Sequence, residues 1–240
     1  MAFDHRSTTR RYLLRTLALA PLGMASLPLL NRLSVGTAHA AQSTSRSPDQ
    51  ALQLLLEGNQ QFVQATQRAG GRTIERRLEL TQGQSPFAII LGCADSRVPP
   101  ELVFETGLGD LFVCRVAGNI ETAEIIGSIE YGVQVLGAPL VMVLGHSGCG
   151  AVDAALAVVT RGAEFAGYLA GLVDQLTPAA ASIVGQPGDP LDNAIRANVQ
   201  MTVSQLLRRD PDLATRVRDG RVRVVGGVYD LASGRVDLVA

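Results

Sequence analysis

The chain has 240 residues, of which 47% are hydrophobic, and this is enough to bury the core of one α/β domain. All 21 basic residues are arginine, which excludes lysine chemistry such as a Schiff base or a P-loop lysine. Three cysteines are too few for a disulfide scaffold in a chain of this size. With a net charge of −1 and no basic run, the composition also argues against nucleic-acid binding.

Residues 1–40 are predicted to be a twin-arginine signal peptide that is cleaved. Arg10 and Arg11 precede a mildly apolar stretch at 16–30, and Thr37-Ala38-His39-Ala40 offers a small-x-small cleavage site before Ala41. A membrane anchor is the alternative, but prolines, a glycine and polar residues interrupt the stretch, which falls short of about 20 clean apolar residues. We therefore expect an exported protein, periplasmic or extracellular, with no stable membrane anchor after cleavage.

Removal of this segment changes the charge and the histidine content of the chain. Residues 1–40 hold five arginines and one aspartate, so 16 basic and 21 acidic groups remain, for a net charge of −5. His5 and His39 also leave, which makes His146 the single histidine of the mature chain. We expect residues 41–47 to be a linker and 48–240 to form a single α/β domain.

Strand and helix patterns alternate through that domain. Ser47 and Pro48 are typical of a helix start, and short apolar runs between breakers indicate buried strands. The alternation predicts a mainly parallel central sheet of about four strands with an antiparallel edge strand, flanked by helices. In chain order we expect a helix from 48, a helix at 74–81, a strand at 87–92, a short helix at 100–104, a strand at 111–116, a helix at 120–136, a strand at 140–144, a helix at 150–160, a partly helical segment at 162–188, a helix at 189–209, and strands at 221–229 and 235–239.

Metal-binding residue types follow two of these strands. Cys93 and Asp95 come directly after the run at 87–92, and His146 and Cys149 come after the run at 140–144. Parallel strands bring such ends to one edge of a sheet, where two thiolates and an imidazole would suit zinc and leave a fourth position open. Asp95 could fill or guard that position. A buried, inert thiol is the alternative for each cysteine alone, and it is the role we expect for Cys114.

Four segments together resemble the β-class carbonic anhydrase family, over about residues 52–239. They are Gly92-Cys93-Ala94-Asp95-Ser96-Arg97-Val98, Gly109 to Asn119, Ser128-Ile129-Glu130-Tyr131-Gly132-Val133, and His146-Ser147-Gly148-Cys149-Gly150. The resemblance implies that one Zn²⁺ per subunit catalyses reversible hydration of carbon dioxide to bicarbonate and a proton. Zinc suits this task because it lowers the pKa of a bound water from about 15.7 towards about 7.

Asp95 and Arg97 are the expected catalytic pair. Their spacing lets the guanidinium meet the carboxylate, and an Asp held ionised in this way can accept a proton and orient the nucleophile. The resemblance adds that Asp95, freed from Arg97, can become the fourth zinc ligand and block the site. A loop-stabilising ion pair is the alternative.

The resemblance also suggests residues for substrate binding and a homodimer or a dimer of dimers. The family's substrate-facing glutamine matches Gln84, and the carbon dioxide pocket, formed partly by the second subunit, is expected to include Phe112, Ala117 and Tyr131. The backbone N–H of Gly148 faces the substrate in this expectation. Phe112 and Tyr131 could equally be core residues, and Gln84 a plain loop residue.

Two other functions compete with carbon dioxide hydration. Relatives of the fold hydrolyse carbon disulfide or carbonyl sulfide, which are also small, linear and apolar. A non-catalytic zinc or anion-binding protein is the second alternative, disfavoured because Asp95 and Arg97 are both present.

Overall fold

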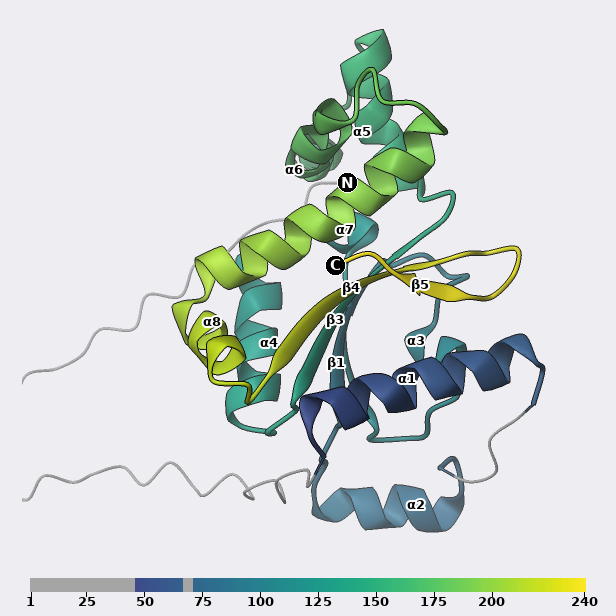
Figure 1. The fold of residues 1–240 in the computed structure, drawn as a ribbon, viewed down its shortest axis with the longest axis vertical. Helices are drawn as coiled ribbons and strands as arrows, with labels where there is room; N and C mark the ends of the chain where they lie inside the picture. The colour runs from purple at the N-terminus through teal and green to yellow at the C-terminus, as the bar shows by residue number, and fades with distance from the viewer. Residues whose placement is uncertain (1–45, 67–70) are drawn as a thin grey trace, which may run out of the picture. The chain divides into compact units, whose positions relative to one another are not determined.

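A computed structural model describes residues 46–66 and 71–240, so the predicted signal peptide and most of the predicted linker lie outside the described residues. The described part contains one sheet in the order β2-β1-β3-β4-β5, in which β5 alone is antiparallel to its neighbour (Figure 1). The strands are β1 Ala88–Gly92, β2 Leu111–Arg115, β3 Leu140–His146, β4 Arg223–Tyr229 and β5 Val236–Leu238. The predicted α/β class, with a mainly parallel sheet and an antiparallel edge, is confirmed.

Helices cover both faces of this sheet, with α1 on one side and α7 on the other (Figure 1). The α-helices are α1 Pro48–Val63, α2 Ile74–Glu79, α3 Pro100–Val103, α4 Ala123–Gln134, α5 Gly150–Arg161, α6 Gly167–Ser182, α7 Pro190–Arg209 and α8 Pro211–Arg218, and the 3₁₀ turns are η1 Leu80–Gln82 and η2 Ala117–Asn119. Ser47 is the N-cap of α1 with Pro48 in first position, as the sequence predicted, and the structure adds a complete capping box with Gln50.

The strand period of two decides which face each side chain meets. Ile89, Leu91 and Cys93 pack in a core with residues of α4 to α7, whereas Ala88 and Ile90 pack with α1 and α3. The central strands β1 and β3 are buried along their whole length, which explains their uninterrupted apolar sequences. Cys93 therefore faces the layer of helices that includes α7.

The structure differs from the sequence prediction at several element ends and in one helix that was missed. Strand β3, for example, continues to His146, two residues beyond the predicted 140–144. The helix expected at 120–136 begins only at Ala123, because Thr122 caps it and η2 precedes it with left-handed φ angles of 75° at Gly118 and 48° at Asn119. Helix α8 was not predicted; it is short, begins at an Asp210 cap with Pro211 in first position, and buries little but Leu213. Strand β4 begins at Arg223, two residues later than expected.

Among the described residues, no helix is both long and apolar enough to cross a membrane.

Candidate metal centre

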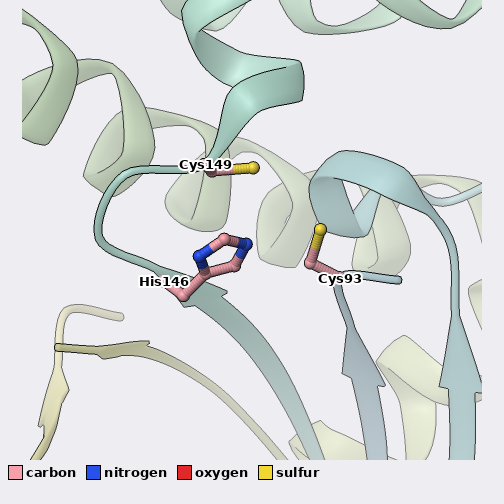
Figure 2. A group of neighbouring side chains, drawn as sticks. All are labelled: Cys93, His146 and Cys149. Carbon is pink, nitrogen blue, oxygen red and sulfur yellow. The ribbon is translucent and has the colours of Figure 1, made fainter. Parts of the chain in front are cut away.

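Cys93, His146 and Cys149 converge at the carboxyl edge of the sheet. Cys93 follows β1, His146 ends β3, and Cys149 is the N-cap residue of α5. All three are buried, and their ligand atoms lie within 4.8 Å of one another. Figure 2 shows the side chains of Cys93, His146 and Cys149 grouped together, with the two sulfur atoms on the same side of the imidazole ring. The parallel pairing of β1 with β3 produces this meeting, because it places both strand ends at the same edge.

The hydrogen bonds of His146 fix which ring nitrogen is available. Nδ1 lies 3.0 Å from the carbonyl oxygen of Ser147, and since a carbonyl only accepts, Nδ1 carries the proton and donates. Nε2 is buried and has no hydrogen-bond partner among the described residues. An orphaned lone pair beside two sulfurs is what a metal ligand requires, and the bond from Nδ1 orients the ring as in other metal sites.

This donor set fits zinc. Two thiolates and one imidazole are soft and borderline ligands, and three protein ligands leave one position open for a reacting molecule. Cys93, His146 and Cys149 would hold the ion. The described residues also place a carboxylate at the centre, since Asp95 Oδ2 lies 3.8 Å from His146 Nε2.

The contact between the Cys93 and Cys149 side chains moves their two pKa values in opposite directions. A hydrogen bond from Cys149 lowers the pKa of Cys93 to about 4, against the opposing effect of burial. The same bond, together with burial, raises the pKa of Cys149 well above its ordinary value. Burial lowers the pKa of His146, but Cys93, the Ser147 carbonyl and the Asp95 carboxylate together raise it overall. The site thus already stabilises one negative sulfur, and a divalent cation would favour the second.

Asp95 and Arg97 form a two-point ion pair beside the cluster. Arg97 Nε donates to Asp95 Oδ1 at 2.9 Å and Arg97 Nη2 donates to Oδ2 at 2.7 Å. The backbone N–H of Arg97 adds a third bond to Oδ1 at 2.9 Å. The Arg97 guanidinium therefore holds the pKa of Asp95 well below its usual range, although burial acts in the opposite direction. The carboxylate is ionised at every physiological pH.

Two of the predicted substrate-binding residues lie close to this centre. Ala117 belongs to η2, and the N–H of the next residue, Gly118, donates to Cys93 Sγ at 3.3 Å. Gly148 lies in the turn between His146 and Cys149, with a left-handed φ of 64°, and its carbonyl accepts from Arg97 Nη2 at 3.4 Å.

The other three do not reach the metal centre of their own chain. Gln84 is exposed and precedes β1, at the end of the strand opposite Cys93. Phe112 is level with Ile89, four residues before Cys93, which is about 13 Å along the strand. Tyr131 lies with Phe112, at 6.1 Å between ring centroids, and is 45% exposed. The structure therefore does not bring these three residues together with Cys93, His146 and Cys149 of the same chain.

Sequence reasoning missed two side chains that hold the centre in place. Arg115, at the end of β2, donates through Nε to the carbonyl of Cys93 at 2.8 Å and through Nη2 to the carbonyl of Asp95. Asn198, on α7, donates to the carbonyl of Gly118 at 2.8 Å. The only trace of Asn198 in the sequence is a polar residue on the apolar face of a helix, three residues after Ile195 and next to Val199.

Comparison with known proteins agrees with this fold. The family model described as carbonic anhydrase matches residues 88–236. The carbonic anhydrase of Mycolicibacterium smegmatis is 40% identical over 194 residues, and carbonic anhydrase 2 of Mycobacterium tuberculosis is 39% identical over 192 residues. Each match covers 80% of this chain and 93% of the relative.

The chain is also similar to a solved carbonic anhydrase structure. The Coccomyxa β-carbonic anhydrase in complex with acetazolamide is 28% identical, with a TM-score of 0.60, and the match covers 68% of this chain and 75% of that one. Fold and site together define an α/β enzyme with a Cys-His-Cys centre at the carboxyl edge of its sheet. The chain belongs to the β-class carbonic anhydrase family.

Proposed function

We propose that this protein is a zinc enzyme that reversibly hydrates carbon dioxide to bicarbonate and a proton. The observation that carries the proposal is the Cys-His-Cys donor set with an ionised carboxylate 3.8 Å from its orphaned imidazole nitrogen. The names of the matched relatives support the same activity.

Zinc, when bound by Cys93, His146 and Cys149, supplies a Lewis acid that makes water acidic enough to act near neutral pH. The protein supplies direction. Asp95, which is ionised and held in position by Arg97, would accept a hydrogen bond from the reacting water and so orient it towards the substrate. The intact pair with Arg97 also supports an arrangement in which Asp95 leaves the fourth metal position open.

The substrate is carbon dioxide in this proposal, rather than carbon disulfide or carbonyl sulfide, because the matched relatives are named for carbonic anhydrase activity. Stopped-flow hydration across pH 7 to 9, on signal-free protein, tests this directly when the two sulfur compounds are assayed on the same preparation. We expect rapid hydration of carbon dioxide. We expect both sulfur compounds to be hydrolysed only at the background rate. Hydrolysis that outpaces hydration would reassign the substrate, and inactivity towards all three would favour a non-catalytic binding role.

We also propose that the working unit is a homodimer or a dimer of dimers. Gln84, Phe112 and Tyr131 support it, since each lies too far from the metal centre of its own chain to act there. Exposed apolar side chains on α2 support it as well, because Ile74 is 62% and Leu78 is 61% exposed in the single chain. A partner that covers α2 would bury them.

We propose further that residues 1–40 direct export through the twin-arginine route, to the periplasm or beyond. Arg10 and Arg11, the interrupted apolar stretch and the small residues before Ala41 support it. Residues 1–47 fused to a folded reporter should export it, and replacement of both arginines by lysine should retain it in the cytoplasm. A reporter exported equally well by both versions would refute the assignment.

A further inference from the structure

Helix α7 contacts the chain segments that carry both halves of the metal centre. Asn198, which is 4% exposed, donates from Nδ2 to the carbonyl of Gly118. The next residue, Val199, packs so closely on Gly145 that a Cβ added there would lie 2.6 Å from Val199 Cγ2. Gly145 immediately precedes His146. Adjacent residues of one helix therefore contact the turn beside Cys93 and the strand end at His146.

The conformation of Gly118 is tightly restricted. Its φ of 75° and ψ of 13° lie in the left-handed region, where only glycine is unstrained. A Cβ at this position would also lie 2.8 Å from Leu176 Cδ1 on α6. In this conformation the N–H of Gly118 donates to Cys93 Sγ at 3.3 Å while its carbonyl accepts from Asn198 at 2.8 Å.

We propose that Asn198 is a positioning residue that holds the Gly118 N–H on the Cys93 sulfur and so tunes the charge that this sulfur donates to the metal. This inference rests on the proposed zinc site. Two thiolates place more negative charge on zinc than imidazoles do, which weakens the ion as a Lewis acid. A hydrogen bond to a ligating sulfur withdraws part of that charge, and the buried amide of Asn198 prevents the turn from rotating the donor away.

The substitution Asn198→Leu tests the proposal, because leucine is close to asparagine in shape but cannot donate. We expect zinc affinity, measured by competition with a chelator, to fall about 10- to 100-fold, the usual effect of losing an outer-shell partner. In cobalt-loaded protein we expect the sulfur-to-cobalt charge-transfer band to move to longer wavelength, because the unbonded sulfur is richer in electrons. Unchanged affinity and an unchanged band would overturn the proposal.

Asn59→Leu is the matched control. Asn59 is another buried asparagine that donates to backbone carbonyls, those of Val103 at 3.1 Å and Gly234 at 2.8 Å. It also accepts from the N–H of Val236 at 2.9 Å, and none of these partners is a metal ligand. The Asn59→Leu protein should be less stable than the unmodified protein, but its sulfur-to-cobalt charge-transfer band should not move. If Asn59→Leu moves the band as far as Asn198→Leu does, the effect is general loosening and the proposal fails.

A measurement on the unmodified protein keeps the proposal testable should Asn198→Leu not fold. With a spin-half cadmium isotope in place of zinc, NMR should detect coupling from the metal to the Gly118 amide proton through the sulfur hydrogen bond. Absence of that coupling in loaded protein contradicts the proposal. Failure of the unmodified chain to bind zinc, cobalt or cadmium at all would instead refute the proposed function.

Discussion

At the scale of single residues, Arg97 determines where the Asp95 carboxylate lies. It has little effect on whether that carboxylate is ionised. Three hydrogen bonds from Arg97 hold the carboxylate, two from the guanidinium and one from the backbone. An aspartate with its ordinary pKa of about 3.9 would still be ionised at pH 8 without any partner. The arginine is therefore needed to aim the carboxylate and to keep it off the metal, and the lowered pKa of Asp95 is a consequence of that contact.

Replacement of Arg97 by alanine should lower the turnover of carbon dioxide hydration by about 100-fold, the usual contribution of one aimed acid–base group. Zinc content should stay at one ion per subunit, because Arg97 contacts no metal ligand side chain. Stopped-flow rates and metal analysis on the same samples measure both. Arg216→Ala, which removes a 2.7 Å ion pair with Asp212 on α8, is the control and should leave the rate unchanged. Full activity of Arg97→Ala with zinc in place would refute the catalytic pair.

The three cysteines are all buried, yet they differ in chemistry. Burial raises the pKa of Cys114 to about 11, so it stays a neutral thiol in the core, as the sequence predicted. We expect Cys114→Ala to keep one zinc per subunit and to lose about 1 kcal/mol of stability, and Cys149→Ala to lose the metal. Metal analysis and chemical denaturation measure the two effects. Zinc retained by Cys149→Ala, or lost by Cys114→Ala, would contradict the ligand assignment.

At the scale of helices and strands, the sequence predicts well wherever local chemistry decides. The strands β1 and β3 are apolar runs between breakers, and the start of α1 has its own cap. The start of α4 was missed because left-handed turns at Gly118 and Asn119 break a helical pattern that continues in the sequence. Gly118 and the capping residue Thr122 both mark that break in the sequence, but the apolar spacing that begins at Ile120 hides it.

Contacts between distant segments account for the rest. The meeting of Cys93 with His146 and Cys149 could be predicted, because parallel strands bring their carboxyl ends to the same edge of the sheet. Asn198 and Arg115 could not, because their role depends on bonds to backbone carbonyls 80 and 22 residues away. Every residue has a backbone carbonyl, so the sequence does not show which carbonyl a distant side chain will bind. A side chain that donates to one therefore looks like any other polar residue in the sequence.

Helix α2 should lie in the subunit interface. Leu78→Glu would place a charge in that contact, and we expect light scattering to show a smaller particle with an unchanged circular dichroism spectrum. Leu169→Glu on α6 is the control, since this leucine is 52% exposed and should leave the assembly intact. An assembly of unchanged mass in Leu78→Glu would place the interface elsewhere. Dissociation in Leu169→Glu as well would show that a charge on any exposed leucine breaks the assembly, so the result would not locate the interface at α2.

At the scale of the whole molecule, the single histidine of residues 41–240 limits proton transfer. His146 donates from Nδ1 to Ser147 and points Nε2 into the metal centre, so no histidine remains to carry a proton to solvent. Turnover at neutral pH should therefore rise steeply with the concentration of an imidazole-type buffer. As a control, the buffer concentration is varied while a salt that does not titrate keeps the ionic strength constant. A turnover independent of buffer would mean that Asp, Tyr or water chains suffice.

The most direct test of the account is zinc content measured beside the hydration rate on one preparation of signal-free protein. We predict one zinc per subunit, loss of hydration in step with zinc as a chelator removes it, and recovery of both when zinc is returned. Protein that hydrates carbon dioxide at full rate without stoichiometric metal would contradict the central claim that Cys93, His146 and Cys149 form a catalytic zinc site.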